Sequence, residues 1–197
     1  MAYFFVGLGN VGEKYELTRH NSGAVVLEYV HLKRGFSPWE INKRLSALVS
    51  KGKIGKEEVI LLLPQTMMNK SGSTLKPLIT GIKKAHRLAV LYDDLDLPLG
   101  SFKISFKRGS GGHKGIESIV RNIKTKEFVR FRIGISPAVR GKDRVEKPRG
   151  EREVIDFILG SFKKRELDVL HQVAKDINEA LHVFVKEGRA SAMNEYN

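Results

Sequence analysis

The stretch YFFVGLGNVG, residues 3–12, begins with an apolar run and ends in glycines and an asparagine. The apolar run predicts a buried strand over 3–8, and Gly9 and Asn10 are residues that end a strand in a turn. The next regular pattern is SGAVVLEYVHLKR, residues 22–34, which predicts a helix capped by Asn21 or Ser22. A buried strand that leads to a helix is the repeating unit of an α/β sheet.

The same alternation continues along the chain. We expect two strands joined by a polar turn within 45–64, further strands at 88–92, 102–107 and 129–135, and helices at about 71–83, 115–124 and 163–187. The sequence therefore predicts an α/β fold, with a mixed, mostly parallel twisted sheet and helices on both of its faces. The length of 197 residues favours a single domain over 1–197.

Composition excludes several classes of protein. Without cysteine the chain has no disulfide framework, no thiolate nucleophile and no cysteine-based zinc site. No apolar run is long enough for a membrane span, so no membrane partner is expected. The first ten residues lack the basic start and small-residue cleavage site of a secretory signal. We therefore expect a cytoplasmic protein, with the stroma or matrix of an organelle as the other possible location.

Charge indicates a polyanionic partner. The 35 Lys and Arg residues outnumber the 22 Asp and Glu residues, which gives a net charge of +13. Six basic residues fall within RGKDRVEKPRGER, residues 140–152, where Gly and Pro oppose a helix. We expect a mobile basic loop over 137–152 that binds a nucleic acid backbone, the alternative being a solvated basic surface without a specific partner.

The glycines of GLGNVG, residues 7–12, match the dinucleotide-binding pattern G-x-G-x-x-G only formally. That pattern requires a helix that starts at once and an acidic residue at the end of a second strand. Here ten polar residues follow, and the first acidic candidate, Glu28, lies inside the next predicted helix. We therefore expect no nucleotide cofactor.

Polar residues cluster where predicted strands end. Asn10, Asn69 and Asp93 follow three of the strands, and His20 and His113 lie in loops before helices. In open α/β sheets the carboxyl ends of strands form the ligand site, although each of these residues could also be a turn former, a cap or a surface residue.

Two kinds of chemistry fit this set. A histidine oriented by Asp93 could take a proton from water, and the asparagines could bind an amide or an oxyanion. DDLD, residues 93–96, could instead hold Mg²⁺ for phosphoryl transfer. No cysteine and no G-x-S-x-G motif are present, so a covalent acyl-enzyme is not indicated.

Five motifs together resemble the bacterial-type peptidyl-tRNA hydrolases: GLGNVG, TRHNSG, PQTMMNKSG, DDLDLPLG and GSGGHKG, in the same order and at similar spacing. The resemblance implies a monomer that cleaves the ester between a peptide and the 3′ ribose of tRNA, with no metal and no cofactor. It implies that His20 is the general base and Asp93 its orienting partner. It implies that Asn10 and Asn69 bind the peptidyl part and that His113 and Met68 line the same crevice. Lys114, beside His113, is also expected to bind the substrate, through a tRNA phosphate.

The basic residues next to these motifs are implied to face tRNA phosphates. They are Lys103, Lys107 and Arg108 before the glycine-rich motif, and Arg140, Lys142, Arg144 and Arg149 in the basic loop. The motif RGSGGHKG, residues 108–115, is then a site loop that presents His113 and Lys114, not a nucleotide cradle.

The chain departs from the family pattern at a few positions. The family usually has Pro at Val11, His at Ser110 and Asn at Lys114, and its loop near 137–152 is usually shorter and less basic. Lys114 matters most, because the family Asn is thought to place the water or stabilise the oxyanion. A non-catalytic RNA-binding scaffold, similar to an organellar splicing factor of this fold, is therefore the alternative to the hydrolase.

Overall fold

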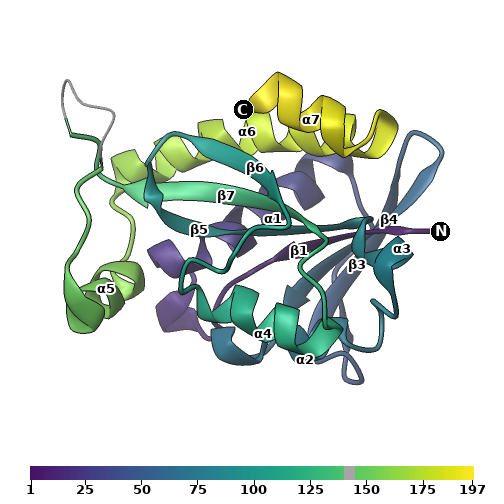
Figure 1. Ribbon diagram of the computed structural model, residues 1–197, viewed down its shortest axis with the longest axis horizontal. Helices are drawn as coiled ribbons and strands as arrows, with labels where there is room; N and C mark the ends of the chain where they lie inside the picture. Colours follow the sequence, from purple (N-terminus) through teal and green to yellow (C-terminus); the bar gives the residue numbers. More distant parts are fainter. Residues whose placement is uncertain (140–144) are drawn as a thin grey trace.

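Seven strands form one sheet in the order β2-β3-β4-β1-β5-β7-β6. The computed structural model describes residues 1–139 and 145–197, and Figure 1 shows the sheet between layers of helices. Strands β4, β1, β5 and β7 run parallel, and β2, β3 and β6 join antiparallel at the two sides. The strands are β1 Tyr3–Gly7, β2 Glu40–Asn42, β3 Ala47–Ile54, β4 Glu57–Pro64, β5 Leu88–Pro98, β6 Phe102–Phe106 and β7 Val129–Ser136.

Helices cover both faces of the sheet. Figure 1 shows α6 and α7 above it and α2 and α4 below it. The helices are α1 Ser22–Arg34, α2 Gly72–Leu75, α3 Ile82–Ala85, α4 Lys114–Ile123, α5 Gly150–Leu159, α6 Lys164–Lys186 and α7 Arg189–Tyr196. Among the described residues, none of these helices has both the length and the apolar composition needed to cross a membrane.

The alternation of side chains along each buried strand builds two cores. On β1, Phe5 joins the core under α1, α6 and α7, whereas Phe4 and Val6 join the core against α2 and α4. Because a strand buried on both faces needs apolar residues at consecutive positions, β1 and the first five residues of β5, 88–92, form unbroken apolar runs. The predicted fold class, a mixed and mostly parallel sheet with helices on both faces, is confirmed.

Two predicted elements differ in the structure. The helix predicted over 71–83 was wrong: α2 ends at Leu75 and α3 begins at Ile82. Pro77 lacks the N–H that would continue the helix, and Gly81 has φ 151°. The strand predicted over 88–92 continues to Pro98, because β7 pairs with it as far as that residue. Helices α5 and α7 and strand β2 were not predicted.

The connections place a crevice beside β1. The chain leaves β1 for α1 on one face and leaves the neighbouring β4 for α2 on the other face. Ligands of open α/β sheets bind at such a reversal, beyond the carboxyl ends of the strands. Asn10 follows β1, and Asp93 lies on β5 two residues beyond Leu91, the partner of the last β1 residue, Gly7.

Candidate active site

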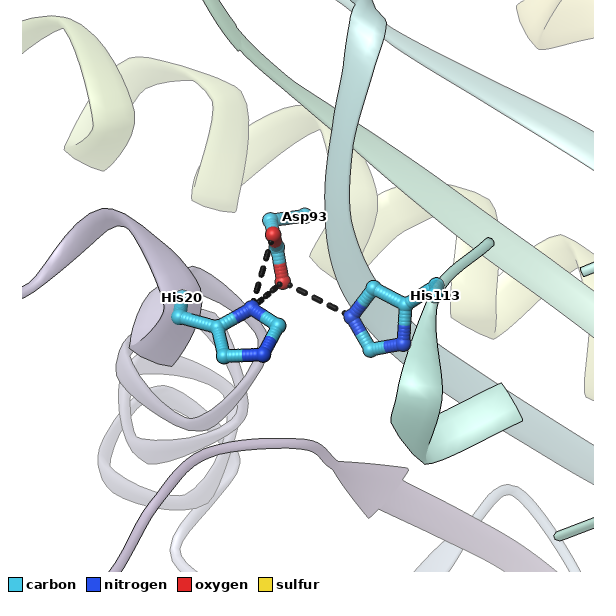
Figure 2. A group of neighbouring side chains, drawn as sticks. All are labelled: His20, Asp93 and His113. Atoms are coloured by element: carbon cyan, nitrogen blue, oxygen red, sulfur yellow. Dashed lines mark hydrogen bonds and ion pairs between the residues drawn. The ribbon is translucent and has the colours of Figure 1, made fainter. Parts of the chain in front are cut away.

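His20 and Asp93 form a buried pair at the carboxyl ends of the strands (Figure 2). The Nδ1 atom of His20 lies 2.9 Å from both carboxylate oxygens of Asp93. A carboxylate only accepts hydrogen bonds, so Nδ1 carries the proton and donates it. For Nε2 of His20 no hydrogen-bond partner is found in the described part of the chain, and this nitrogen is the one that can accept a proton from water.

The short 3-10 helix Arg19–Asn21 holds His20 in place. Next to it, Arg19 donates to both carboxylate oxygens of Glu166, at 2.9 and 3.0 Å, and to the carbonyl of Gly160. These contacts tie the segment to the ends of α5 and α6, so the imidazole is fixed from its backbone as well as through Asp93.

His113 contacts the same carboxylate from the other side, as Figure 2 shows. Its Nε2 donates to Oδ1 of Asp93 at 2.9 Å, and its Nδ1 accepts from the backbone N–H of Ile116, where it caps α4. Both ring nitrogens are therefore engaged. His113 is suited to orient Asp93 and to line the site, whereas His20 keeps a free nitrogen.

Electrostatics favour a charged Asp93. Burial would raise the pKa of Asp93, but the two histidines beside it outweigh burial and hold that pKa well below its ordinary value. Burial would likewise lower the pKa of His20, yet the charge and hydrogen bond of Asp93 raise it above its ordinary value. The pair therefore consists of a carboxylate and an imidazole whose protonated form is stabilised.

An asparagine pair braces the neighbouring loop. The backbone N–H of Asn10 donates to Oδ1 of Asn21 at 2.8 Å, and Nδ2 of Asn21 donates back to the carbonyl of Asn10 at 3.0 Å. The side-chain Oδ1 of Asn10 accepts from the backbone N–H of Met68 at 2.8 Å. Within the described residues the Nδ2 group of Asn10 has no partner, so it remains a free donor at the site.

Two cavities adjoin these residues. The first, of about 550 Å³, is lined by His20, Tyr92, Asp93, the glycine-rich loop, Arg132, Lys147 and the inner side of α5. The second, of about 410 Å³, is lined by Asn10, Asn21, Glu16, Glu28 and apolar residues of α1, β3 and β4. The adjacent residues His20 and Asn21 thus line different cavities.

The acidic residues after Asp93 are already paired with cations. Arg132 donates from Nε to Oδ2 of Asp94 at 2.7 Å, and Lys147 donates to Oδ1 of Asp96 at 2.6 Å. A Mg²⁺ ion at DDLD would have to compete with these two contacts. His20, Asp93 and His113 offer another possible set of metal ligands, with ligand atoms within 4.8 Å of one another, but an ion there would replace the hydrogen bonds that orient His20.

The structure brings some of the predicted site residues together and not others. His20, Asp93, His113, Lys114 and Arg108 line the first cavity, and Asn10 lines the second. The side chain of Met68 lies in the core, so this residue contributes to the site through its backbone N–H, which donates to Asn10. Asn69 is exposed in the 3-10 helix Met68–Lys70 and lines neither cavity.

The predicted tRNA-facing residues fall into two groups, those that the structure describes and those that it does not. Lys103, Lys107, Arg108 and Arg149 are exposed, and Lys107 is paired with Glu127 at 2.9 Å. Arg140, Lys142 and Arg144 lie outside the described residues. Helix α5 begins at Gly150, inside the range predicted as a loop.

Three residues of the site were not predicted in this role: Asn21, Arg132 and Lys147. A signal for Arg132 was present, because VRFRIGI, residues 129–135, alternates apolar and basic residues and so points both arginines to one face.

Comparisons with known proteins agree with one another. The family described as peptidyl-tRNA hydrolase matches residues 4–197. A peptidyl-tRNA hydrolase from Listeria welshimeri is 37% identical over 97% of each chain, and one from Koribacter versatilis is 36% identical over 98% of this chain and 90% of the other. The crystal structure of peptidyl-tRNA hydrolase from Acinetobacter baumannii superposes with a TM-score of 0.86 at 28% identity, covering 100% of this chain and 94% of that one. A complex of peptidyl-tRNA hydrolase with N-propanol superposes with a TM-score of 0.87 at 29% identity and the same coverage.

Proposed function

Because the chain belongs to the peptidyl-tRNA hydrolase family, we propose that it hydrolyses the ester bond between a peptide and the 3′ ribose of tRNA, which releases the tRNA. The observation that carries the proposal within the site is the free Nε2 of His20, opposite an Nδ1 that Asp93 fixes at 2.9 Å. This arrangement suits a base that takes a proton from water.

The proposed reaction begins at this nitrogen. His20 Nε2 accepts a proton from water, and the water oxygen attacks the ester carbonyl carbon. Asp93 stabilises the imidazolium that forms, as its effect on the pKa of His20 indicates. Collapse of the tetrahedral intermediate breaks the bond to the ribose oxygen, which takes the proton from His20. The peptide leaves as a carboxylic acid, which then loses its proton to solvent.

The intermediate carries a negative charge on the former carbonyl oxygen. The free Nδ2 group of Asn10 is the donor that we propose for it, since the side chain is already fixed through the backbone N–H of Met68. A donor that is held before substrate arrives needs no reorganisation during the reaction. We propose that Asp93 is in turn steadied by the second hydrogen bond, from His113.

The two cavities differ in their charges, which suggests how the substrate lies. The charged residues that line the second cavity, Glu16 and Glu28, are both acidic and would repel phosphate, so we assign this cavity to the peptide. The first cavity is lined by four basic residues, Arg108, Lys114, Arg132 and Lys147, and by four acidic ones, Asp93, Asp94, Asp96 and Glu151. Asp94 and Asp96 are paired with Arg132 and Lys147, and Asp93 with the two histidines. The exposed Arg108 and Lys114 can therefore meet a phosphate, and we assign this cavity to the tRNA end. Lys103, Lys107, Arg149 and the loop residues Arg140, Lys142 and Arg144 would extend this contact along the RNA backbone.

A single incubation separates the candidate functions. Purified protein is mixed with N-acylaminoacyl-tRNA in the presence of EDTA, and release of the N-acylamino acid is followed. Turnover under these conditions supports the hydrolase, whereas tight binding without turnover supports the RNA-binding scaffold. Phosphodiester cleavage that EDTA abolishes would support the magnesium chemistry instead.

The role of Lys114 is tested separately, because the family usually has Asn at this position. Its side chain is 67% exposed, and Nζ lies 3.9 Å from Glu117, so it is free to reach outward from the start of α4. We propose a contact with a tRNA phosphate. Lys114→Asn should then weaken tRNA binding and keep or raise the turnover number, whereas a fall of about 10²-fold in the single-turnover rate for Lys114→Ala would assign the lysine to the oxyanion.

A further inference from the structure

Arg130 is a fully buried arginine with very few partners. Its exposed fraction is 0%, and it lies on β7 beneath the glycine-rich loop. The guanidinium donates from Nη1 to the carbonyl of Gly109 at 2.7 Å and lies over the ring of Phe128 at 4.7 Å. Nε and Nη2 are buried without a hydrogen-bond partner, and no ion pair joins Arg130 to a carboxylate in the described residues.

Stability alone does not account for an arginine at this position. A buried cation without a counter-charge loses its hydration, and an apolar side chain of similar size in such a place is often neutral or stabilising. Methionine, for example, could fill the space beside Phe128. What an apolar residue cannot do is donate a hydrogen bond to Gly109.

Gly109 belongs to the segment that carries His113. Residues 107–113 run from the end of β6 to the start of α4, and two consecutive residues in it, Gly111 and Gly112, have positive φ values of 60° and 81°. The far end is fixed where His113 donates to Asp93 and caps α4. The near end is exposed. Lys107 pairs there with Glu127 at the surface, and Arg130 holds Gly109 from below.

A second contact leads from Arg130 toward the same histidine. Tyr92 stands on β5 opposite Arg132, two residues along β7 from Arg130, and its ring meets that of His113 edge-on, with centroids 4.8 Å apart. Burial raises the pKa of Tyr92, and the charge of Arg130 opposes this rise. Arg130 thus supports His113 through the loop and through Tyr92.

We propose that Arg130 is a positioning residue of the hydrolase: by holding Gly109 it fixes the loop 107–113 and keeps His113 against Asp93. Arg130 does not line the cavity that contains His20. Its effect on catalysis therefore passes through other residues. The predicted effect on activity rests on the proposed function, whereas the predicted effect of Arg130 on the loop is independent of that function.

The test compares Arg130→Met, Arg130→Lys and Ser105→Ala. Methionine keeps the volume of the side chain without a hydrogen-bond donor, and lysine keeps the charge and a donor. Ser105 is the control, because it is the β6 partner of Arg130 on β7, and its buried Oγ makes no hydrogen bond to the loop. For Arg130→Met we expect a melting temperature equal to or above that of the wild type. The single-turnover rate at saturating peptidyl-tRNA should fall by about 10–100-fold while the dissociation constant changes little. Arg130→Lys should recover most of that rate, and Ser105→Ala should match the wild type.

Amide hydrogen exchange measures the opening of the loop directly and does not depend on enzyme activity. In Arg130→Met the amides of 109–113 should exchange at least about tenfold faster, with those of β7 unchanged. An Arg130→Met protein whose loop exchange and single-turnover rate stay within about twofold of wild type would overturn the proposal, as would parallel losses of stability and activity that lysine does not rescue. Exchange that responds as expected in a protein without hydrolysis would leave the loop contact standing and reject the proposed function.

The wild-type chain provides a check even if no variant folds. NMR relaxation should give Gly109 and Ser110 backbone order parameters of about 0.85, the value of rigid structure, despite their place in a glycine-rich loop. Values below about 0.6 at both residues would mean that the contact with Arg130 does not hold the loop, and the proposal would fall.

Discussion

A histidine that takes a proton from water needs one ring nitrogen fixed and the other free. His20 meets both conditions, because Asp93 occupies Nδ1 and the protein leaves Nε2 open. His113, 5.0 Å away between ring centroids, meets only the first, since Asp93 and the N–H of Ile116 engage both of its nitrogens. The two histidines were alike in the sequence, where each precedes a helix, and only their hydrogen bonds separate their roles.

This difference predicts unequal losses. His20→Ala should lower the single-turnover rate by about 10²–10⁴-fold, the usual contribution of a general base, with tRNA affinity nearly unchanged. His113→Ala should cost less, because Asp93 would still hold His20. Both are measured with saturating peptidyl-tRNA and compared with binding of deacylated tRNA. A His20→Ala protein that keeps more than a tenth of the wild-type rate would remove His20 from this role.

The same pair predicts a shift in pH dependence. The base acts only when neutral, so kcat/KM should fall as the pH drops through the pKa of His20, which Asp93 raises above its ordinary value. In Asp93→Asn the raising charge is gone while burial still lowers that pKa, so the midpoint of the acid limb should move to lower pH, and the plateau should also fall. Profiles of kcat/KM for both proteins test this, and an unmoved midpoint would mean that the limb does not report His20.

At the scale of elements, the site depends on how closely α1 approaches the sheet. A Cβ atom placed on Gly23, in the first turn of α1, would lie 2.2 Å from the backbone oxygen of Leu91 on β5. Only glycine permits this approach. Because His20 precedes α1 and Asp93 follows Leu91, the same contact sets the distance between the two site residues.

Gly23→Ala should therefore disturb stability and activity together. We expect a loss of about 1–3 kcal/mol in the free energy of unfolding, typical of overpacking, from urea titration. Catalysis should fall more than affinity, since His20 and Asp93 move apart. Gly109→Ala is the matched control for stability alone, because a Cβ there meets nothing within 4 Å, whereas Gly109 belongs to the loop that carries His113. Equal stability of the two variants would show that α1 can shift without cost.

The sequence predicts elements well where one local pattern decides them. Helix α1 lies where its apolar spacing placed it, at Ser22–Arg34, and the pair β3 and β4 lies within the predicted range. The helix over 71–83 failed because Pro77 and Gly81 act against a pattern that looks helical. Strand β5 was cut short because DDLDLP is polar, and pairing with β7, a contact distant in sequence, extends it.

At the scale of the whole molecule, the site could be foreseen only as a set of strand ends. Asn10 and Asp93 follow from the rule for α/β sheets, and the structure places them in the linings of two cavities, with the adjacent residues Asn21 and His20. Arg132, Lys147 and Asn21 depend on which elements face one another, which local patterns do not reveal. Arg132 shows this best: its partner Asp94 lies on the neighbouring parallel strand, 38 residues earlier in the chain.

The net charge of +13 makes its own prediction about binding. Each phosphate that the protein neutralises releases a counterion, so the affinity for tRNA should fall steeply with salt, by about 0.7–0.9 in log K per decade of salt for each phosphate contacted. Lys103 stands opposite Arg132 across β6 and β7, and Arg108 lines the first cavity, so both lie near the proposed tRNA end.

Replacing Lys103 and Arg108 by Gln should therefore reduce the slope of log K for tRNA binding against log salt concentration, by the amount expected for about one to two phosphate contacts. Hydrolysis of a minimal ester substrate should stay unchanged. Lys33 and Lys53 provide the control, since both are exposed and lie at the opposite end of the fold, Lys53 opposite Glu58 at the start of β4 and Lys33 in the last turn of α1. The two double variants lose the same charge, so a general field effect would change both slopes equally. A contact changes only the first, because the released counterions belong to the phosphates that Lys103 and Arg108 touch.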